Sequence, residues 1–239
     1  GSVPFSLSHK VICLARFGPC WHTPVMNAVG SATPPVSPLS ALPFLPQLCG
    51  KSGAAPGDAA CFALWDKYAM LANIRRHSLL VAHIATALAR KAEALGLPVR
   101  AAQVRASALL HDIAKTYCVR YGGSHAQVGA AWTVAETGNY AVAQGVMLHV
   151  WWPWSLPQGT DICALPFFVM YADKRVRHDA CVTLEERYDD LLQRYGRTEE
   201  AREGIRAAYR QGKTIEDALA VLLGWSLHED SFDSGRLVH

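Results

Sequence analysis

The stretch ALLHDIAK, residues 108–115, places a histidine and an aspartate side by side inside an otherwise apolar segment. If this segment is helical, His111 shares a face with Ala108 and Val104, which precede it by three and seven positions. The imidazole then points toward the interior of the protein. Burying an imidazole beside a carboxylate is costly unless both groups are paired, hydrogen-bonded or bound to a metal. The stretch therefore predicts a helical core that contains a polar site.

Four further stretches place one histidine or aspartate beside an apolar helical stripe. In RRHSLLVAHIA, for example, His77 shares a face with Val81 and Ile84. GGSHAQVGA, GVMLHVWW and VMYADKRV show the same pattern. A helical core does not ordinarily collect this many ionisable side chains. The candidate set is His77, His111, Asp112, His125, His149 and Asp173.

The chemistry of this set favours a catalytic metal. Imidazole nitrogens together with carboxylate oxygens suit Fe, Mn, Zn or Co, and the absence of thiolates from the set argues against a structural zinc. Any one of these histidines taken alone is more simply explained as a hydrogen-bonded core residue. The set as a whole predicts divalent metal binding.

The order of these residues along the chain resembles the HD-domain superfamily of metal-dependent phosphohydrolases. The segment HDIAK, residues 111–115, is similar to the HDIG-type signature of that superfamily. The resemblance covers about residues 70–180. Two histidines lie between the His-Asp pair and the last aspartate, as in the dinuclear members, so the chain most resembles the bacterial diadenosine tetraphosphate hydrolases.

The resemblance implies two divalent metal ions, with Fe or Mn favoured and Mg, Co, Ni or Zn as alternatives. It implies that one ion is held by His77, His111, Asp112 and Asp173, and the other by Asp112, His125 and His149. A water shared by two such cations would lose a proton near neutral pH and attack phosphorus. We therefore expect hydrolysis of a phosphoester or phosphoanhydride bond in a small, nucleotide-like substrate.

Cationic residues beside the set are expected to bind the substrate phosphate. Lys115 lies one turn beyond Asp112 and matches a family lysine that helps to hold phosphate, so these two residues are the expected catalytic pair. Arg76 precedes the first ligand and Arg175 follows the last, and a guanidinium can clamp a phosphate bidentately. Surface ion pairs are the competing interpretation for both arginines.

A tryptophan-rich loop follows the last predicted histidine ligand. Its sequence, VWWPWSLPQGT, places three tryptophans around Pro153. These side chains could stack a nucleobase over the site. Packing of the loop against the body of the protein is the competing interpretation.

The first 60 residues contain nine of the 13 prolines and only four charged residues. We therefore expect a proline-rich N-terminal extension over residues 1–58. Residues 59–239 show long apolar-periodic stretches and almost no alternation of period two, which predicts an all-α bundle. The resemblance implies that this bundle is an HD domain with additional C-terminal helices. The expected helices before residue 180 span about 60–72, 75–95, 99–115, 125–137, 140–150 and 162–178.

Helix-start and helix-stop signals divide the last third of the chain. Thr183 with Glu186, and Thr214 with Asp217, have the spacing of capping boxes. The glycines at 196 and 212 stand where helices would end. Together these signals predict three C-terminal helices.

The composition excludes several classes of protein. The chain has 239 residues, of which 51% are hydrophobic and 18% charged, so it can bury a substantial core. A net charge of only +3 excludes the broad basic field that binding to a nucleic-acid duplex requires. No apolar run reaches the roughly 18 residues of a membrane span. The seven cysteines form no C-x-x-C pair, which favours reduced thiols in a cytoplasmic protein. The oligomeric state is left open.

Two other functions share the same predicted ligands. Some HD-fold proteins use a mixed-valent di-iron pair to activate dioxygen, and they resemble this sequence at the same six positions. Others are noncatalytic regulatory modules that bind a nucleotide or a protein partner. Degenerate modules usually lose ligands, whereas this sequence retains all six.

Overall fold

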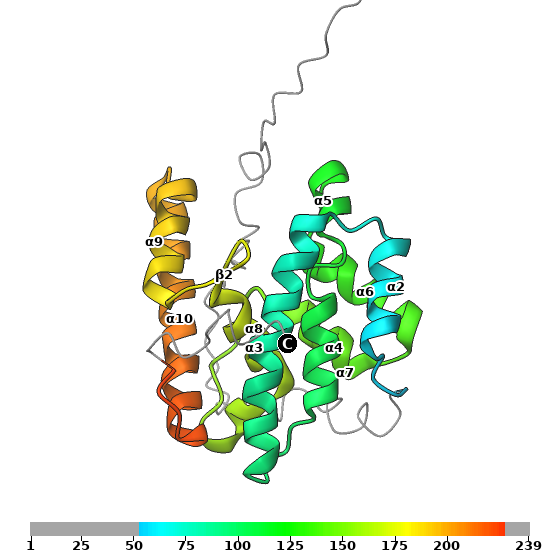
Figure 1. Cartoon of the computed structure of the whole chain (residues 1–239). Helices are drawn as coiled ribbons and strands as arrows, with labels where there is room; N and C mark the ends of the chain where they lie inside the picture. Colours follow the sequence, from blue (N-terminus) through cyan, green and yellow to red (C-terminus); the bar gives the residue numbers. More distant parts are fainter. Residues whose placement is uncertain (1–52, 228–239) are drawn as a thin grey trace, which may run out of the picture.

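The computed structural model describes residues 53–227, so nearly all of the predicted N-terminal extension lies outside the described residues. As predicted, the fold is all-α, apart from one two-stranded hairpin. No helix within the described range is both long enough and apolar enough to cross a membrane. In chain order (Figure 1) the elements are α2 (Asp58–Lys67), α3 (Ala72–Ala94), α4 (Ala101–Leu110), α5 (Lys115–Tyr121), α6 (His125–Thr137), α7 (Tyr140–Leu148), the short 3₁₀ helix η1 (Gly159–Cys163), α8 (Leu165–Lys174), β1 (Val176–Arg177), β2 (Ala180–Cys181), α9 (Leu184–Tyr195) and α10 (Glu199–Leu223).

The long helix α3 organises the core. It packs against α4 and α8, while α7 contacts α4, α6 and α8 (Figure 1). The inner face of α3 carries Val81, Ile84 and Leu88, all fully buried and spaced as the sequence predicts. His77 continues this stripe toward the start of the helix and is itself buried. Apolar periodicity therefore places this histidine on the inner face.

A tight turn separates α4 from α5 at the His-Asp pair. α4 ends at Leu110, whereas the predicted helix continues to residue 115. The N–H of Ile113 donates to the carbonyl of Leu110, and the N–H of Lys115 donates to the carbonyl of Asp112. These three-residue steps wind more tightly than an α-helix. The sequence did not predict α5, because none of its residues is buried and it therefore has no apolar stripe.

The first of the two predicted capping boxes is confirmed. The hydroxyl of Thr183 accepts the N–H of Glu186 at 3.2 Å, and the Glu186 carboxylate accepts the N–H of Thr183 at 3.0 Å. α9 then ends at Gly196, as predicted.

The second predicted box, at Thr214, is wrong. α10 continues through this position, so the described chain ends in two helices rather than three. The Thr214 hydroxyl donates to the carbonyl of Arg210 one turn earlier, which satisfies it inside the helix. Gly212, the predicted helix end, is also interior to α10. A Cβ there would lie 3.3 Å from Lys174 Cδ and 3.8 Å from Leu184 Cδ1, so the glycine allows α10 to approach α8 and α9.

A hairpin replaces the end of the helix predicted over 162–178. Val176 pairs with Cys181 and Arg177 pairs with Ala180 in antiparallel register. The turn contains His178 with a φ of 61°, a left-handed conformation that few residues other than glycine adopt. Both strands contact α3.

Gly145 lies where α7 comes closest to its neighbours. A Cβ at this position would overlap Ser107 of α4 and Leu165 of α8. We expect Gly145→Ala to lower the free energy of unfolding by about 1–3 kcal/mol, because overpacking outweighs the better helix propensity of alanine. Urea unfolding followed by circular dichroism measures the loss. Gly57→Ala is the control, because no atom lies within 4 Å of its new Cβ. Equal stability of Gly145→Ala and Gly57→Ala would contradict this packing argument.

Candidate metal centre

The structure brings all six predicted polar residues into one cluster. Five segments of the bundle contribute to it: the early part of α3, the turn after α4, the first residue of α6, the C-terminal end of α7, and α8. In that order they supply His77, then His111 with Asp112, then His125, His149 and Asp173. Because these segments are far apart in sequence, the cluster requires the folded bundle.

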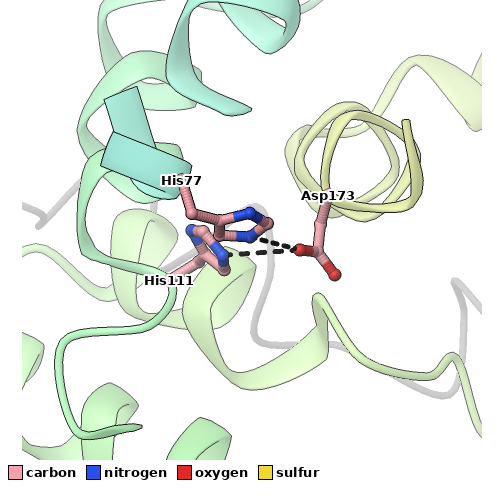
Figure 2. Close-up of side chains that lie close together, drawn as sticks. All are labelled: His77, His111 and Asp173. Carbon is pink, nitrogen blue, oxygen red and sulfur yellow. Dashed lines mark hydrogen bonds and ion pairs between the residues drawn. The ribbon is translucent and has the colours of Figure 1, made fainter. Parts of the chain in front are cut away.

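Four donor atoms meet on one side of the cluster. Nε2 of His77 lies 2.9 Å from Oδ1 of Asp173 and 3.9 Å from Oδ2 of Asp112. Nε2 of His111 lies 3.6 Å and 3.4 Å from the same two oxygens. Figure 2 shows both imidazoles directed from one side at the carboxylate of Asp173, which comes from the helix on the other side. This convergence of nitrogen and oxygen donors fits a divalent metal ion.

A second group of donors faces the other oxygen of Asp112. Nε2 of His125 lies 3.3 Å from Oδ1 of Asp112, and Nε2 of His149 lies 3.8 Å from it. The two Nε2 atoms are 3.2 Å apart. Asp112 therefore presents one carboxylate oxygen to each group of histidines, as a bridging ligand would.

Backbone carbonyls orient three of the imidazoles. Nδ1 of His111 and Nδ1 of His149 each lie 2.7 Å from the carbonyl oxygen three residues earlier. Nδ1 of His77 lies 3.1 Å from the carbonyl oxygen of His178. Because a carbonyl can only accept, each Nδ1 is the donor, so Nε2 has a lone pair for a metal whenever the ring is neutral. This is the support that metal-ligating histidines ordinarily have.

Two buried atoms at the centre show why the cluster suits a cation. Nε2 of His111 and Oδ1 of Asp112 have no hydrogen-bond partner among residues 53–227. These side chains are 0% and 1% exposed, so water does not solvate them freely. An unsatisfied buried polar group costs roughly 1–3 kcal/mol. A cation placed between the donor groups would satisfy both atoms, so the residues present fit a divalent metal ion.

The local electrostatics leave the carboxylates charged. Burial alone would raise the pKa of Asp112, but Lys115 and the histidines outweigh burial and hold it well below its usual value. Burial would likewise raise the pKa of Asp173, but the nearby imidazoles of His111 and His77 outweigh burial and hold it well below its usual value. Two ionised carboxylates inside the protein create a strongly negative field.

The histidines respond differently according to their position in this field. Burial and the charge of His111 hold the pKa of His149 well below its usual value, and burial also lowers the pKa of His125. For His111, burial opposes protonation, but the charges of Asp112 and Asp173 prevail and raise the pKa to about 10. Positive charge is therefore favoured between the two carboxylates, whether it is a proton or a metal ion.

Of the predicted phosphate-binding residues, Lys115 lies at the cluster. Its Nζ donates to Oδ2 of Asp112 at 2.6 Å, and its side chain is 41% exposed, so it can also reach a substrate. Arg76 is exposed and pairs with Asp179 at 3.4 Å. For Arg76, the structure therefore shows the surface ion pair that was the competing interpretation.

The prediction that Arg175 binds phosphate is wrong. The Arg175 side chain is completely buried. Its Nε donates to the carbonyl of Val182 at 2.6 Å, and its Nη1 donates to Tyr171 Oη and to the carbonyl of Leu227. Nη1 also lies 3.6 Å from the buried carboxylate of Glu216. The guanidinium is thus part of the packing between α8 and α10.

The tryptophan-rich loop packs against the body through Trp152. This side chain is 2% exposed, and its ring centroid lies 4.8 Å from that of Phe167. Its backbone N–H and carbonyl pair with the side-chain amide of Gln211 at 3.0 and 2.9 Å. Packing is therefore the correct interpretation for Trp152, whereas Trp154 is 42% exposed.

Sequence analysis missed the role of His178. Its carbonyl oxygen orients His77, and Nε2 of its ring lies 3.0 Å from Nη2 of Arg194. This contact is made by the backbone carbonyl of a residue in the left-handed conformation, so no pattern of side chains in the sequence could predict it.

Comparison with known proteins identifies one family. The family model described as HD domain matches residues 74–177, a range that spans the whole cluster. The match supports the HD-domain superfamily. Searches of curated proteins and of solved structures return no match.

Asp112 should be the residue on which metal binding depends most. We expect Asp112→Ala to lose all bound metal, because both donor groups lose a ligand, while the helical circular dichroism signal is retained. Plasma mass spectrometry of protein purified without chelator or a metal-affinity column measures metal per chain. Asp179→Ala, at an exposed aspartate, is the matched control. Unchanged metal content in Asp112→Ala would refute the assignment.

The left-handed conformation of His178 should matter more than its imidazole. His178→Gly preserves both the carbonyl and the positive φ, so we expect metal affinity close to that of the wild type. His178→Val disfavours this conformation, and a disturbed ligand support typically costs about 10–100-fold in metal affinity. Competition titration against a fluorescent chelator compares the variants. Equal affinity of the glycine and valine variants would show that the turn does not support His77.

Proposed function

We propose that this chain is a metal-dependent phosphohydrolase that cleaves a phosphoester or phosphoanhydride bond in a small, nucleotide-like substrate. The HD domain at residues 74–177 indicates a superfamily of this type. The observation that carries the proposal is the Asp112 carboxylate, whose two oxygens face two separate groups of imidazole nitrogens within 4 Å.

Within the superfamily, we propose an HDIG-type dinuclear site. One ion would be held by His77, His111, Asp112 and Asp173, and the other by Asp112, His125 and His149. Nitrogen and oxygen donors without thiolate favour Fe or Mn, with Mg, Co, Ni or Zn as alternatives. Two divalent ions in these positions would polarise a phosphoryl oxygen and lower the pKa of a water molecule.

The protein itself contributes a positioned hydrogen-bond donor, Lys115. Burial would lower the pKa of Lys115, but the charges of Asp112 and Asp173 prevail and raise it, so the ammonium group stays charged. One hydrogen of Nζ is used by Asp112, and the other two are available to a phosphoryl oxygen. Lys115 would thus hold the substrate phosphate against the cluster.

The charge of the loaded site supports an anionic substrate. The carboxylates of Asp112 and Asp173 neutralise only half of the charge of two divalent ions, and Lys115 adds a further positive charge. A phosphate dianion is an effective counter-charge in such a site. A neutral polyol leaves this excess charge unbalanced, whereas a phosphonate, the other class of substrate of the di-iron oxygenases, would balance it.

Exposed aromatic side chains support the nucleotide-like character of the substrate. On α5, which begins at Lys115, Tyr117 is 44% exposed and Tyr121 is 66% exposed. Their ring centroids lie 4.8 Å apart. Exposed aromatic faces stack nucleobases without demanding a particular sequence.

A hydrolysis screen tests the proposal. We expect the Mn- or Fe-loaded protein to release phosphate from nucleotides, or mononucleotides from dinucleoside polyphosphates, under nitrogen, and chelation to abolish this activity. Oxygen consumption with polyol or phosphonate substrates would instead establish the oxygenase. Nucleotide binding without turnover by the metal-replete protein would establish a regulatory module.

Lys115→Met separates substrate binding from metal binding. We expect a fall in kcat/KM of about 10²–10³-fold, the usual cost of removing one donor to a developing negative charge. Metal content should be unchanged, because Lys115 is not a proposed ligand. Lys91→Met on α3, an exposed lysine, should retain full activity. A Lys115→Met protein as active as the control would exclude Lys115 from the site.

A further inference from the structure

Two buried side chains from other helices hold the segment that follows α7. Nζ of Lys174, the last residue of α8, donates to the carbonyls of His149 at 3.3 Å and of Val150 at 3.2 Å. The side-chain amide of Gln211, on α10, pairs with the N–H and the carbonyl of Trp152 at 3.0 and 2.9 Å. Four backbone groups of one short segment are therefore fixed from α8 and α10.

Lys174 connects the two groups of donors in the metal centre. It directly follows Asp173, whose carboxylate faces His77 in the first group. It also binds the backbone of His149, whose imidazole belongs to the second group. The His149 ring itself is oriented by the carbonyl of Val146, which lies 2.7 Å from Nδ1. The backbone and the ring of this ligand are thus held by two separate contacts.

The end of α7 is a favourable place for an ammonium group. The last carbonyls of a helix have no partner within it, and the helix dipole places negative charge there. The carbonyl of His149, the residue that follows Leu148 at the end of α7, is one of these groups. Lys174 therefore satisfies the end of α7 and links it to α8.

Packing alone does not account for a lysine at this position. Lys174 is 6% exposed, and burying an ammonium group is costly unless it is well hydrogen-bonded. Gly212 of α10 leaves room for the lysine stem, because a Cβ there would lie 3.3 Å from Lys174 Cδ. A methionine would fill the same space without the cost of burying a charge. It would not provide the two hydrogen bonds to the end of α7.

We propose that Lys174 is a positioning residue for the second metal ion. By holding the backbone of His149 next to α8, it places this imidazole where it can share an ion with Asp112 and His125. None of the ligands proposed for the first ion lies on α7, so the first ion does not depend on this contact. The inference rests on the proposed function, since it assigns the support of one of the two proposed metal sites.

Stepwise metal titration tests this assignment. In competition with a fluorescent chelator, the wild-type apoprotein should bind two Mn²⁺ ions per chain, and His149→Ala identifies the step that belongs to the second ion. Lys174→Met should weaken that step about 10–100-fold, the usual cost of losing a group that supports a ligand. The affinity for the first ion should be unchanged. Lys91→Met, at an exposed lysine on α3, is the matched control and should bind both ions as the wild type does.

Lys174→Arg separates positioning from packing. Arginine keeps charged donors but is larger than lysine, whereas methionine fills the space and donates nothing. If Lys174 positions His149, the arginine variant should bind the second ion more tightly than the methionine variant. A packing role alone predicts the reverse order, and that order would overturn the inference. If Lys174→Met loses its helical circular dichroism signal, the shorter Lys174→Gln replaces it and should show the same loss of the second ion.

The inference and the proposed function fail in different ways. A second ion that depends on Lys174, in a protein that hydrolyses no phosphoester, would support the positioning role and refute hydrolysis. Unchanged affinity for the second ion in Lys174→Met, in a protein that hydrolyses nucleotides, would refute the positioning role and leave the proposed function intact. A wild-type protein that binds only one ion at saturation would overturn the inference together with the dinuclear site.

Discussion

The buried carboxylate of Asp112 is the constraint on which the rest of the site depends. It is 1% exposed, and removing an ionised carboxylate from water costs several kcal/mol unless cations approach it. Lys115 approaches one oxygen, and the histidines approach both. Because the two oxygens point in different directions, two donor groups form around one residue. The dinuclear character of the proposal follows from this single position.

The bundle holds these donors with its backbone as much as with its core. His111 and His149 lie at the ends of α4 and α7, where each Nδ1 is within hydrogen-bonding distance of the carbonyl three residues earlier. Carbonyls in the last turn of a helix have no partner within the helix, so a histidine there gains an acceptor at no cost to the helix. A histidine ligand at a helix end therefore has its imidazole oriented by a backbone carbonyl, and that carbonyl gains the hydrogen bond that the helix does not supply.

Much of this arrangement could be predicted from the sequence, because a helix converts spacing into direction. Apolar periodicity places His77 on the buried face of α3. The same reasoning selects the other five polar residues as candidates, whereas their grouping around two ions comes from the family resemblance. Contacts between different helices, in contrast, cannot be predicted from the spacing of apolar residues along one helix. Gly212 has the appearance of a helix end and is instead a point of close approach, and His178 acts through a backbone conformation. Both depend on segments that are distant in sequence.

Arg175 shows the same limit beside the site itself. Arg175 is two residues from Asp173, and two residues turn a helix by about 200°, so the two side chains leave α8 on nearly opposite sides. Its guanidinium consequently reaches Val182 and Leu227 instead of the cluster. His77, by contrast, shares a face with the fully buried Val81 and lies in the cluster. Nearness in sequence to a metal ligand is therefore a poor guide to which side chains on a helix reach the site. The face shared with a buried residue is a better one.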